Sequence, residues 1–251
     1  MTAHPMNPHP RRTSGQPLVL VAHGSRDPRA LATVSALADR VRDLRPGLPV
    51  HLGHIELNAP LLPDTLAALG DREAVLVPLL LSRGYHIKQD IPDMIAASGA
   101  RTRVAAPLGP HPLLAEALAT RLTEAGWTRG TAVVLAAAGS RDPEAALDTS
   151  HMARLLSDRL GGVPVVPAYA SAARPTVPEA VRALKARGHR HIAVASYFTA
   201  PGRFATESAQ AAPDRAAVPM GTHPAMAHLI LHRYDQARRT APVQRTLAIL
   251  T

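Results

Sequence analysis

Three side chains that can bind a metal ion or move a proton each lie at or just beyond an apolar run of the sequence. His23 follows residues 18–22, Glu56 lies at the end of residues 50–57, and His86 comes shortly after residues 74–81. Imidazole and carboxylate ligands suit borderline divalent cations such as Fe²⁺, Co²⁺ or Ni²⁺. A neutral imidazole is also a base near physiological pH, and a carboxylate can hold or accept the proton. These residue types therefore predict a metal site, a proton-abstraction site, or both.

The apolar runs and the helical repeats between them predict the elements that would position these side chains. Strands are expected at residues 18–22, 50–57, 74–81 and 101–106, and helices from Asp27-Pro28 onward and at residues 60–69, 91–97 and 113–125. This alternation predicts a parallel sheet with helices on both faces. Ligands bind beyond the carboxyl ends of such strands, so His23, Glu56 and His86 should meet at one edge.

The second half of the chain repeats the first. Residues 18–28 (LVLVAHGSRDP) recur as residues 133–143 (VVLAAAGSRDP), and residues 107–112 (PLGPHP) recur as residues 219–224 (PMGTHP). We therefore predict an α/β protein of two tandem homologous domains, each a four-stranded parallel sheet flanked by helices, with the active site in the cleft between them. The predicted boundaries are a flexible tail at residues 1–16, an N-terminal domain carrying the active site at 17–128, and a degenerate repeat at 131–251.

Comparing the two halves separates the candidate catalytic residues from the residues that shape the fold. The three candidates of the first half are missing from the second, where the equivalent positions hold Ala138, Ser171 and either Arg203 or Phe204. Residues that both halves share are assigned to fold geometry, and they include Gly24 and Gly139, Ser25 and Ser140, Asp27 and Asp142, and His111 and His223. One site per chain is therefore expected, with the C-terminal half as its opposite wall.

Each candidate also has a purely structural interpretation. A histidine after a strand is more often a hydrogen-bonded loop residue, and a glutamate at a strand end is usually a solvated rim group. Convergence of His23, Glu56 and His86 at three successive strand ends favours a site. His54 would share a face with Glu56 by alternation, and it either joins the site or meets solvent or a packed helix.

Composition narrows the classes of partner and location. The formal net charge is +9, from 28 Lys and Arg against 19 Asp and Glu, which favours anionic partners, although an arginine bias can also reflect genome composition. Scattered arginines and an aromatic content of 3% argue against a nucleic-acid partner. The absence of cysteine excludes thiolate sites. No apolar run approaches the roughly 18 residues that span a bilayer, so a cytoplasmic protein without a membrane partner is expected.

Four segments together resemble the sirohydrochlorin chelatase and CbiX cobaltochelatase family. Residues 23–28 (HGSRDP) after a strand resemble its opening motif, and Glu56 with Pro60 and Pro63 its second. Residues 79–92 (LLLSRGYHIKQDIP) resemble its third and most specific motif, and residues 107–112 its fourth. The resemblance covers nearly the whole chain apart from the tail, including the duplicated form.

The resemblance implies a class II chelatase, a metal-inserting lyase that needs no ATP and has no tightly bound cofactor besides its divalent metal substrate. The implied partner is a carboxylate-rich tetrapyrrole such as sirohydrochlorin, which takes Fe²⁺ for siroheme, Co²⁺ for cobalamin, or in some members Ni²⁺. In the family, the histidines matching His23 and His86 bind the metal and help take the pyrrole protons. The acid matching Glu56 assists as ligand or proton acceptor. We favour iron and siroheme.

Groups beside these residues are candidates for binding the substrate carboxylates. They are the arginines Arg26, Arg83 and Arg203, the backbone at Gly24 and Ser25, and the neighbours Gly84 and Tyr85. Arginine can grip a carboxylate with two parallel hydrogen bonds, and N–H groups at a helix start attract anions. For each arginine the alternative is a solvated surface charge.

Two rival functions would use the same residues. A non-enzymatic cobalt or nickel carrier would bind metal without accelerating insertion. Phosphoryl transfer through His23 ranks low, because histidine phosphatases place an arginine directly before the histidine and Ala22 stands there. Two halves in one chain can complete their own cleft, which is compatible with a monomer.

Overall fold

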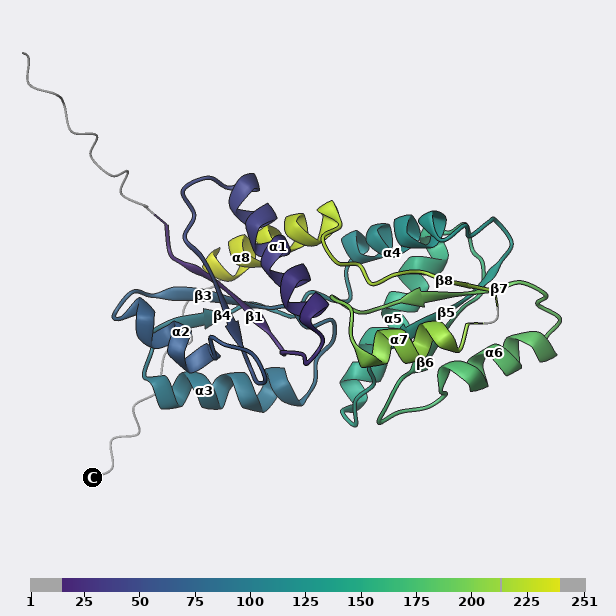
Figure 1. The fold of residues 1–251 in the computed structure, drawn as a ribbon, viewed down its shortest axis with the longest axis horizontal. Coiled ribbons are helices and arrows are strands. Elements are labelled where there is room, and N and C mark those ends of the chain that lie inside the picture. Colours follow the sequence, from purple (N-terminus) through teal and green to yellow (C-terminus); the bar gives the residue numbers. More distant parts are fainter. Residues whose placement is uncertain (1–14, 213, 240–251) are drawn as a thin grey trace, which may run out of the picture.

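The computed structural model describes residues 15–212 and 214–239 and shows two similar α/β units side by side (Figure 1). Each unit holds a four-stranded parallel sheet, in the order β2-β1-β3-β4 in one and β6-β5-β7-β8 in the other. The predicted fold class is confirmed. The predicted tail at residues 1–16 lies almost wholly outside the described residues.

The bounds of the elements follow the predicted alternation. The first half contains β1 (Leu18–Ala22), α1 (Pro28–Leu44), β2 (Val50–His54), α2 (Leu62–Leu69), β3 (Ala74–Pro78), a π-helical turn η1 (His86–Asp90), α3 (Ile91–Ser98), β4 (Thr102–Val104) and α4 (Pro112–Glu124). The second half contains β5 (Ala132–Ala137), α5 (Pro143–Arg159), β6 (Val165–Tyr169), α6 (Val177–Ala186), β7 (Ile192–Ser196), α7 (Arg203–Gln210), β8 (Arg215–Ala216) and α8 (Pro224–Arg239).

Buried apolar strands and capped helices explain why these residues fold this way. Every residue of β1, β3, β5 and β7 is buried, as expected for central strands covered on both faces. The repeated Ser-Arg-Asp-Pro segment is a helix start in both halves. Asp27 caps α1 by accepting from the backbone N–H of Arg29, and Asp142 caps α5 in the same way. The assignment of Asp27 and Asp142 to fold geometry is therefore confirmed.

The structure departs from the predicted elements around the site. Residues 50–57 were expected to form one strand, but β2 ends at His54, so Glu56 lies in the loop beyond it. Leu57 has a positive φ of 65°, which no strand accommodates. Likewise, β3 ends at Pro78, and the carbonyl oxygens of Leu79 and Leu81 beyond it accept hydrogen bonds from the other half. The turn η1, which carries His86, was not predicted.

The two halves exchange their closing helices. Helix α4 of the first half packs against α5 and β7, and α8 of the second half packs against α1, β3 and β4 (Figure 1). One apolar cluster consequently runs through both units, from Leu37 and Leu118 to Met152 and Tyr234. The exchange interlocks the two units. No helix in the described part of the chain is long and apolar enough to cross a membrane.

Candidate active site

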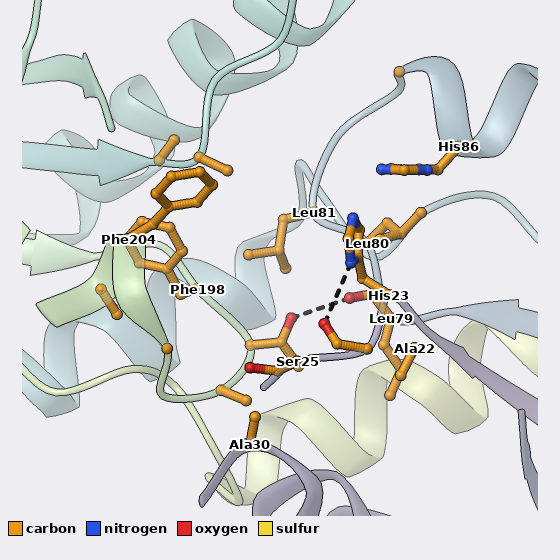
Figure 2. Close-up of a pocket in the computed structure, with 18 of the residues that line it drawn as sticks. Ala22, His23, Ser25, Ala30, Leu79, Leu80, Leu81, His86, Phe198 and Phe204 are labelled. Carbon is orange, nitrogen blue, oxygen red and sulfur yellow. Dashed lines mark hydrogen bonds between the residues drawn. The ribbon is translucent and has the colours of Figure 1, made fainter. Parts of the chain in front are cut away.

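A large cavity opens between the two units at the carboxyl ends of their central strands. Its volume is about 1170 Å³, above the usual 300–1,000 Å³ of small-molecule pockets. The N-terminal half lines it with the loops that follow β1 and β3, and the C-terminal half with those that follow β5 and β7. Figure 2 shows His23 and His86 on one side of this cavity and Phe198 and Phe204 on the other.

A glycine brings His23 and Glu56 together. Gly24 has a φ of 105°, and a Cβ there would overlap the carbonyl oxygen of Glu56. Only glycine therefore lets the loop after β1 lie against the loop after β2. The same device recurs at Gly139, where a Cβ would overlap the carbonyl oxygen of Ser171.

The two imidazoles lie against each other at the edge of the first sheet. The ring centroids of His23 and His86 are 4.5 Å apart and the rings are perpendicular. Their side chains are 43% and 38% exposed, so both can meet a ligand in the cavity. Glu56 Oε1 lies 3.5 Å from His23 Nδ1. The structure thus brings the three predicted residues together.

Sequence reasoning gave no role to Asp90, which holds the second imidazole. Its Oδ2 lies 2.5 Å from Nδ1 of His86, one turn earlier on η1. Each imidazole therefore has a carboxylate beside Nδ1, and His23 Nδ1 also lies 3.3 Å from the carbonyl oxygen of Gly24. Acceptors at Nδ1 favour the tautomer protonated there, which leaves each Nε2 lone pair for a metal or a proton. The i, i+4 spacing of His86 and Asp90 was the available signal.

Within residues 15–212 and 214–239, no group of three or more His, Asp or Glu side chains is arranged to hold a metal ion. Glu56 lies at the Nδ1 edge of His23, which is the place of an imidazole's partner rather than of a third ligand in a cage. Two imidazoles with open positions around the cation would hold a metal loosely. That arrangement suits an ion that must be passed on.

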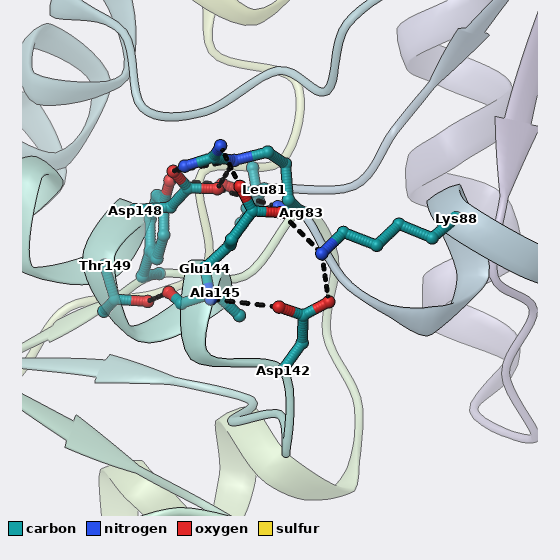
Figure 3. A network of polar contacts seen from close by, with 9 residues as sticks. Leu81, Arg83, Lys88, Asp142, Glu144, Ala145, Asp148 and Thr149 are labelled. Atoms are coloured by element: carbon teal, nitrogen blue, oxygen red, sulfur yellow. Dashed lines mark hydrogen bonds and ion pairs between the residues drawn. The ribbon is translucent and has the colours of Figure 1, made fainter.

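Arg83 was predicted as a carboxylate clamp, but its guanidinium already pairs with carboxylates of α5. It lies 2.6 Å from Asp148 and 2.7 Å from Glu144 (Figure 3). The hydrogen bonds to Asp148 raise the pKa of the Arg83 guanidinium. The side chain of Asp148 is only 6% exposed. Lys88 extends the network with contacts of 2.6 Å to Asp142 and 2.5 Å to Glu144. Arg83 thus ties the halves together at one end of the cleft.

The other predicted substrate contacts fall into two groups. Arg26 and Arg203 line the cavity with exposed side chains, and Arg26 has no ion-pair or hydrogen-bond partner in the part of the chain that the structure describes. The backbone N–H of Ser25, in contrast, already donates to Asn58 Oδ1 at 2.7 Å. Gly84 approaches Ser140 of the other half, and the exposed Tyr85 lies at the cavity rim.

The remaining histidines named from the sequence have structural places. His54 is buried, with Nδ1 3.1 Å from the carbonyl oxygen of Pro60. His111 and His223 accept backbone N–H groups at the starts of α4 and α8. The assignment of His111 and His223 to fold geometry is confirmed. His54 is only 2% exposed and is also one of the residues that line the cavity, so a part for it in the site stays a prediction.

Comparison with known proteins identifies the family of the repeated domain. The CbiX family model matches residues 17–125 and again residues 132–237. The chain belongs to the CbiX family. The double match also accounts for the internal repeat, since each half corresponds to one copy of the family domain.

Named relatives of this CbiX-family chain are chelatases. The sirohydrochlorin cobaltochelatase of Methanococcus aeolicus is 35% identical over 81 residues, which is 31% of this chain and 57% of that protein. The sirohydrochlorin ferrochelatase of Priestia megaterium is 25% identical over 235 residues, covering 86% of this chain and 88% of its own length. The alignments thus span less than two thirds of the Methanococcus protein and most of the Priestia ferrochelatase.

Solved structures agree on the fold. The chelatase SirB from Bacillus subtilis with Fe³⁺ superimposes with a TM-score of 0.74 at 22% identity, covering 88% of this chain and 95% of SirB. SirB of the spizizenii subspecies in complex with cobalt gives a TM-score of 0.70 at 21% identity, covering 88% and 94%. The CbiX-family chain therefore shares the two-unit architecture of SirB.

Proposed function

We propose that the protein is a sirohydrochlorin chelatase that inserts a divalent metal into its tetrapyrrole without ATP, with Fe²⁺ as the favoured metal and siroheme as the product. The observation that carries the proposal is the pair of perpendicular imidazoles, His23 and His86, each backed by a carboxylate and both facing a cavity of about 1170 Å³. Names of relatives within the family support the substrate.

Insertion exchanges one divalent cation for two pyrrole N–H protons. His23 and His86 would hold the cation at one face of the macrocycle through Nε2, while ring nitrogens replace its solvent ligands stepwise. As each nitrogen loses its proton, an imidazole released from the metal accepts it. Glu56 and Asp90, at the Nδ1 edges, stabilise the imidazolium and can pass a proton to water. The metal is a substrate throughout, and no tightly bound cofactor takes part in this scheme.

Charge at the cleft suits a carboxylate-covered ring. The chain has a net charge of +9, and Arg26 and Arg203 are exposed at the cavity. Such a cleft attracts a polyanion and orients it before close contact is made. The proposal includes no nucleic-acid or membrane partner. It places the protein in the cytoplasm. It also takes the protein to be a monomer, because one chain already lines both walls of the cavity.

Two imidazoles do not by themselves select iron over cobalt. The alignment with the Priestia ferrochelatase, over most of both chains, supports Fe²⁺. The second candidate is Co²⁺ insertion for cobalamin, which the relatives named cobaltochelatase support. Initial rates with equal free Fe²⁺ and Co²⁺ under anoxic conditions decide between them, and we expect the higher kcat/KM with Fe²⁺.

The test of the activity is the absorbance change as sirohydrochlorin is metallated, followed with and without protein. We expect a rate well above the spontaneous one. His151, exposed on α5 and outside the cavity lining, provides a control, since His151→Ala should keep the wild-type rate. A rate equal to the spontaneous one would reject the chelatase, and tight metal binding without acceleration would identify a carrier instead.

A further inference from the structure

The chain has only two phenylalanines, and both line the wall that faces the imidazoles. Phe198 follows β7 and Phe204 lies in the first turn of α7, and each is partly exposed at the cavity. Figure 2 shows the two rings together on the C-terminal wall, across the cavity from His23 and His86. Nothing in the chemistry of metal holding or proton transfer accounts for them.

The internal repeat shows which residue Phe204 replaces. Val75 of β3 pairs with Leu18 of β1, and Ala193 of β7 pairs with Val133 of β5. Because residues 18 and 133 are equivalent in the repeat, residues 75 and 193 are equivalent too. Counting on from them carries His86 onto Phe204, which settles the choice between Arg203 and Phe204. Where one wall presents an imidazole, the other presents a benzene ring.

Hydrogen bonds across the cleft fix the aromatic wall relative to the imidazoles. The hydroxyl of Tyr197 donates to the carbonyl oxygen of Leu81 at 2.8 Å, and Thr199 Oγ1 donates to that of Leu79 at 3.1 Å. These two residues flank Phe198, and their acceptors lie on the loop that leads to His86. The two walls are therefore joined at the floor of the cavity.

We propose that Phe198 and Phe204 form an aromatic shelf that stacks on one face of the tetrapyrrole, so that the other face is turned toward the imidazoles. This inference rests on the proposed function and adds the way in which the ring is oriented. A flat conjugated macrocycle offers aromatic side chains a large face for stacking. The equivalents of His23 and Glu56 on this wall, Ala138 and Ser171, have small side chains.

Arg203 completes the shelf at its edge. Its guanidinium carbon lies 4.8 Å from the centroid of Phe204, a cation–π distance. Its Nε also lies 3.9 Å from Glu207 Oε1, and the side chain is 76% exposed. A ring stacked on Phe204 would bring its peripheral carboxylates within reach of this cation. The same helix start thus supplies one contact for the face of the macrocycle and one for its rim.

The test measures binding of metal-free sirohydrochlorin, which separates ring holding from metal chemistry. Phe204→Leu and Phe198→Leu keep apolar bulk but lose the aromatic face, and each should raise the Kd for the ring about 3- to 10-fold. Phe204→Tyr keeps the face and should bind like the wild type. Co²⁺ binding in the absence of the ring should be unchanged in all three variants, because the imidazoles lie on the other wall.

Val218→Ala is the matched control, since Val218 is 59% exposed and lies outside the cavity lining. Phe198 also packs against a core cluster, and Phe198→Leu could therefore fail to fold. In that case the result for Phe204, at the surface of α7, decides the test. Unchanged ring affinity in Phe204→Leu, in a wild type that metallates sirohydrochlorin, would overturn the shelf alone. A wild type that neither binds nor metallates the ring would overturn the proposed function and the shelf together.

Discussion

Replacing Asp90 tests how the imidazoles are held. Asp90 Oδ2 lies 2.5 Å from Nδ1 of His86, and the two side chains are 27% and 38% exposed. Hydrogen bonds to charged groups contribute about 1.5–3 kcal/mol, and the exposure of this pair reduces the value to about 1–2 kcal/mol. Since 1.4 kcal/mol is about a factor of ten, Asp90→Ala should weaken Co²⁺ binding about 5- to 30-fold.

The physical reason is that His86 loses both its orientation and the carboxylate that makes Nε2 a better ligand. The assay is a Co²⁺ titration followed by visible absorbance, together with the initial rate of metal insertion. Asp90→Asn should recover part of the loss, because its amide oxygen can still accept the Nδ1–H bond.

Asp93→Asn is the matched control on the adjoining helix. Asp93 pairs with Gln89 at 2.9 Å, so the substitution should leave metal affinity and rate unchanged. The reasoning is refuted if Asp90→Ala stays within twofold of the wild type in both measurements, or if the Asp93 control loses as much.

Three further changes probe the frame around the site. Tyr197→Phe leaves the carbonyl oxygen of Leu81 without its donor and should lower the free energy of unfolding by about 1–2 kcal/mol in urea titrations; an unchanged value would show that water replaces the bond freely. Gly24→Ala places a Cβ on the carbonyl oxygen of Glu56 and should abolish insertion, so an active, stable variant would contradict the role of this bend. Burial, with Arg233 and His232 nearby, lowers the pKa of His111 from 6.5 to about 4. The unfolded chain therefore binds this proton first, and stability should fall as pH drops from about 6.5 toward 4. His111→Asn, which keeps the helix cap, should flatten that pH dependence of unfolding, and an equally steep profile would count against the assignment.

Most of the fold could be predicted from local sequence patterns. Buried strands are continuous apolar runs, and the Asp-Pro pairs at residues 27–28 and 142–143 start helices through side-chain caps that depend only on neighbouring residues. Because the second half repeats the first, the elements predicted for one half applied to the other as well. Strand ends were less predictable, because the loop at Glu56 depends on how tightly Gly24 packs against it.

Long-range contacts account for what the sequence could not show. An apolar helix face has the same pattern whichever sheet it covers, so the exchange of α4 and α8 left no local signal. The ion pairs of Arg83 join residues more than 60 positions apart in the chain, and only the folded chain shows that its guanidinium is occupied. Asp90 was within reach of prediction, but its role depends on residues 86–90 being helical.

The central claim is that His23 and His86 hold one metal ion together and deliver it to the ring. The most direct measurement is the initial rate of sirohydrochlorin metallation by His23→Ala, His86→Ala and the double variant. Because the two side chains act as a unit, each single change should reduce the rate at least about 100-fold, and the double change should reduce it little further. Turnover within a few-fold of the wild type in both single variants, with unfolding curves unchanged, would contradict the account.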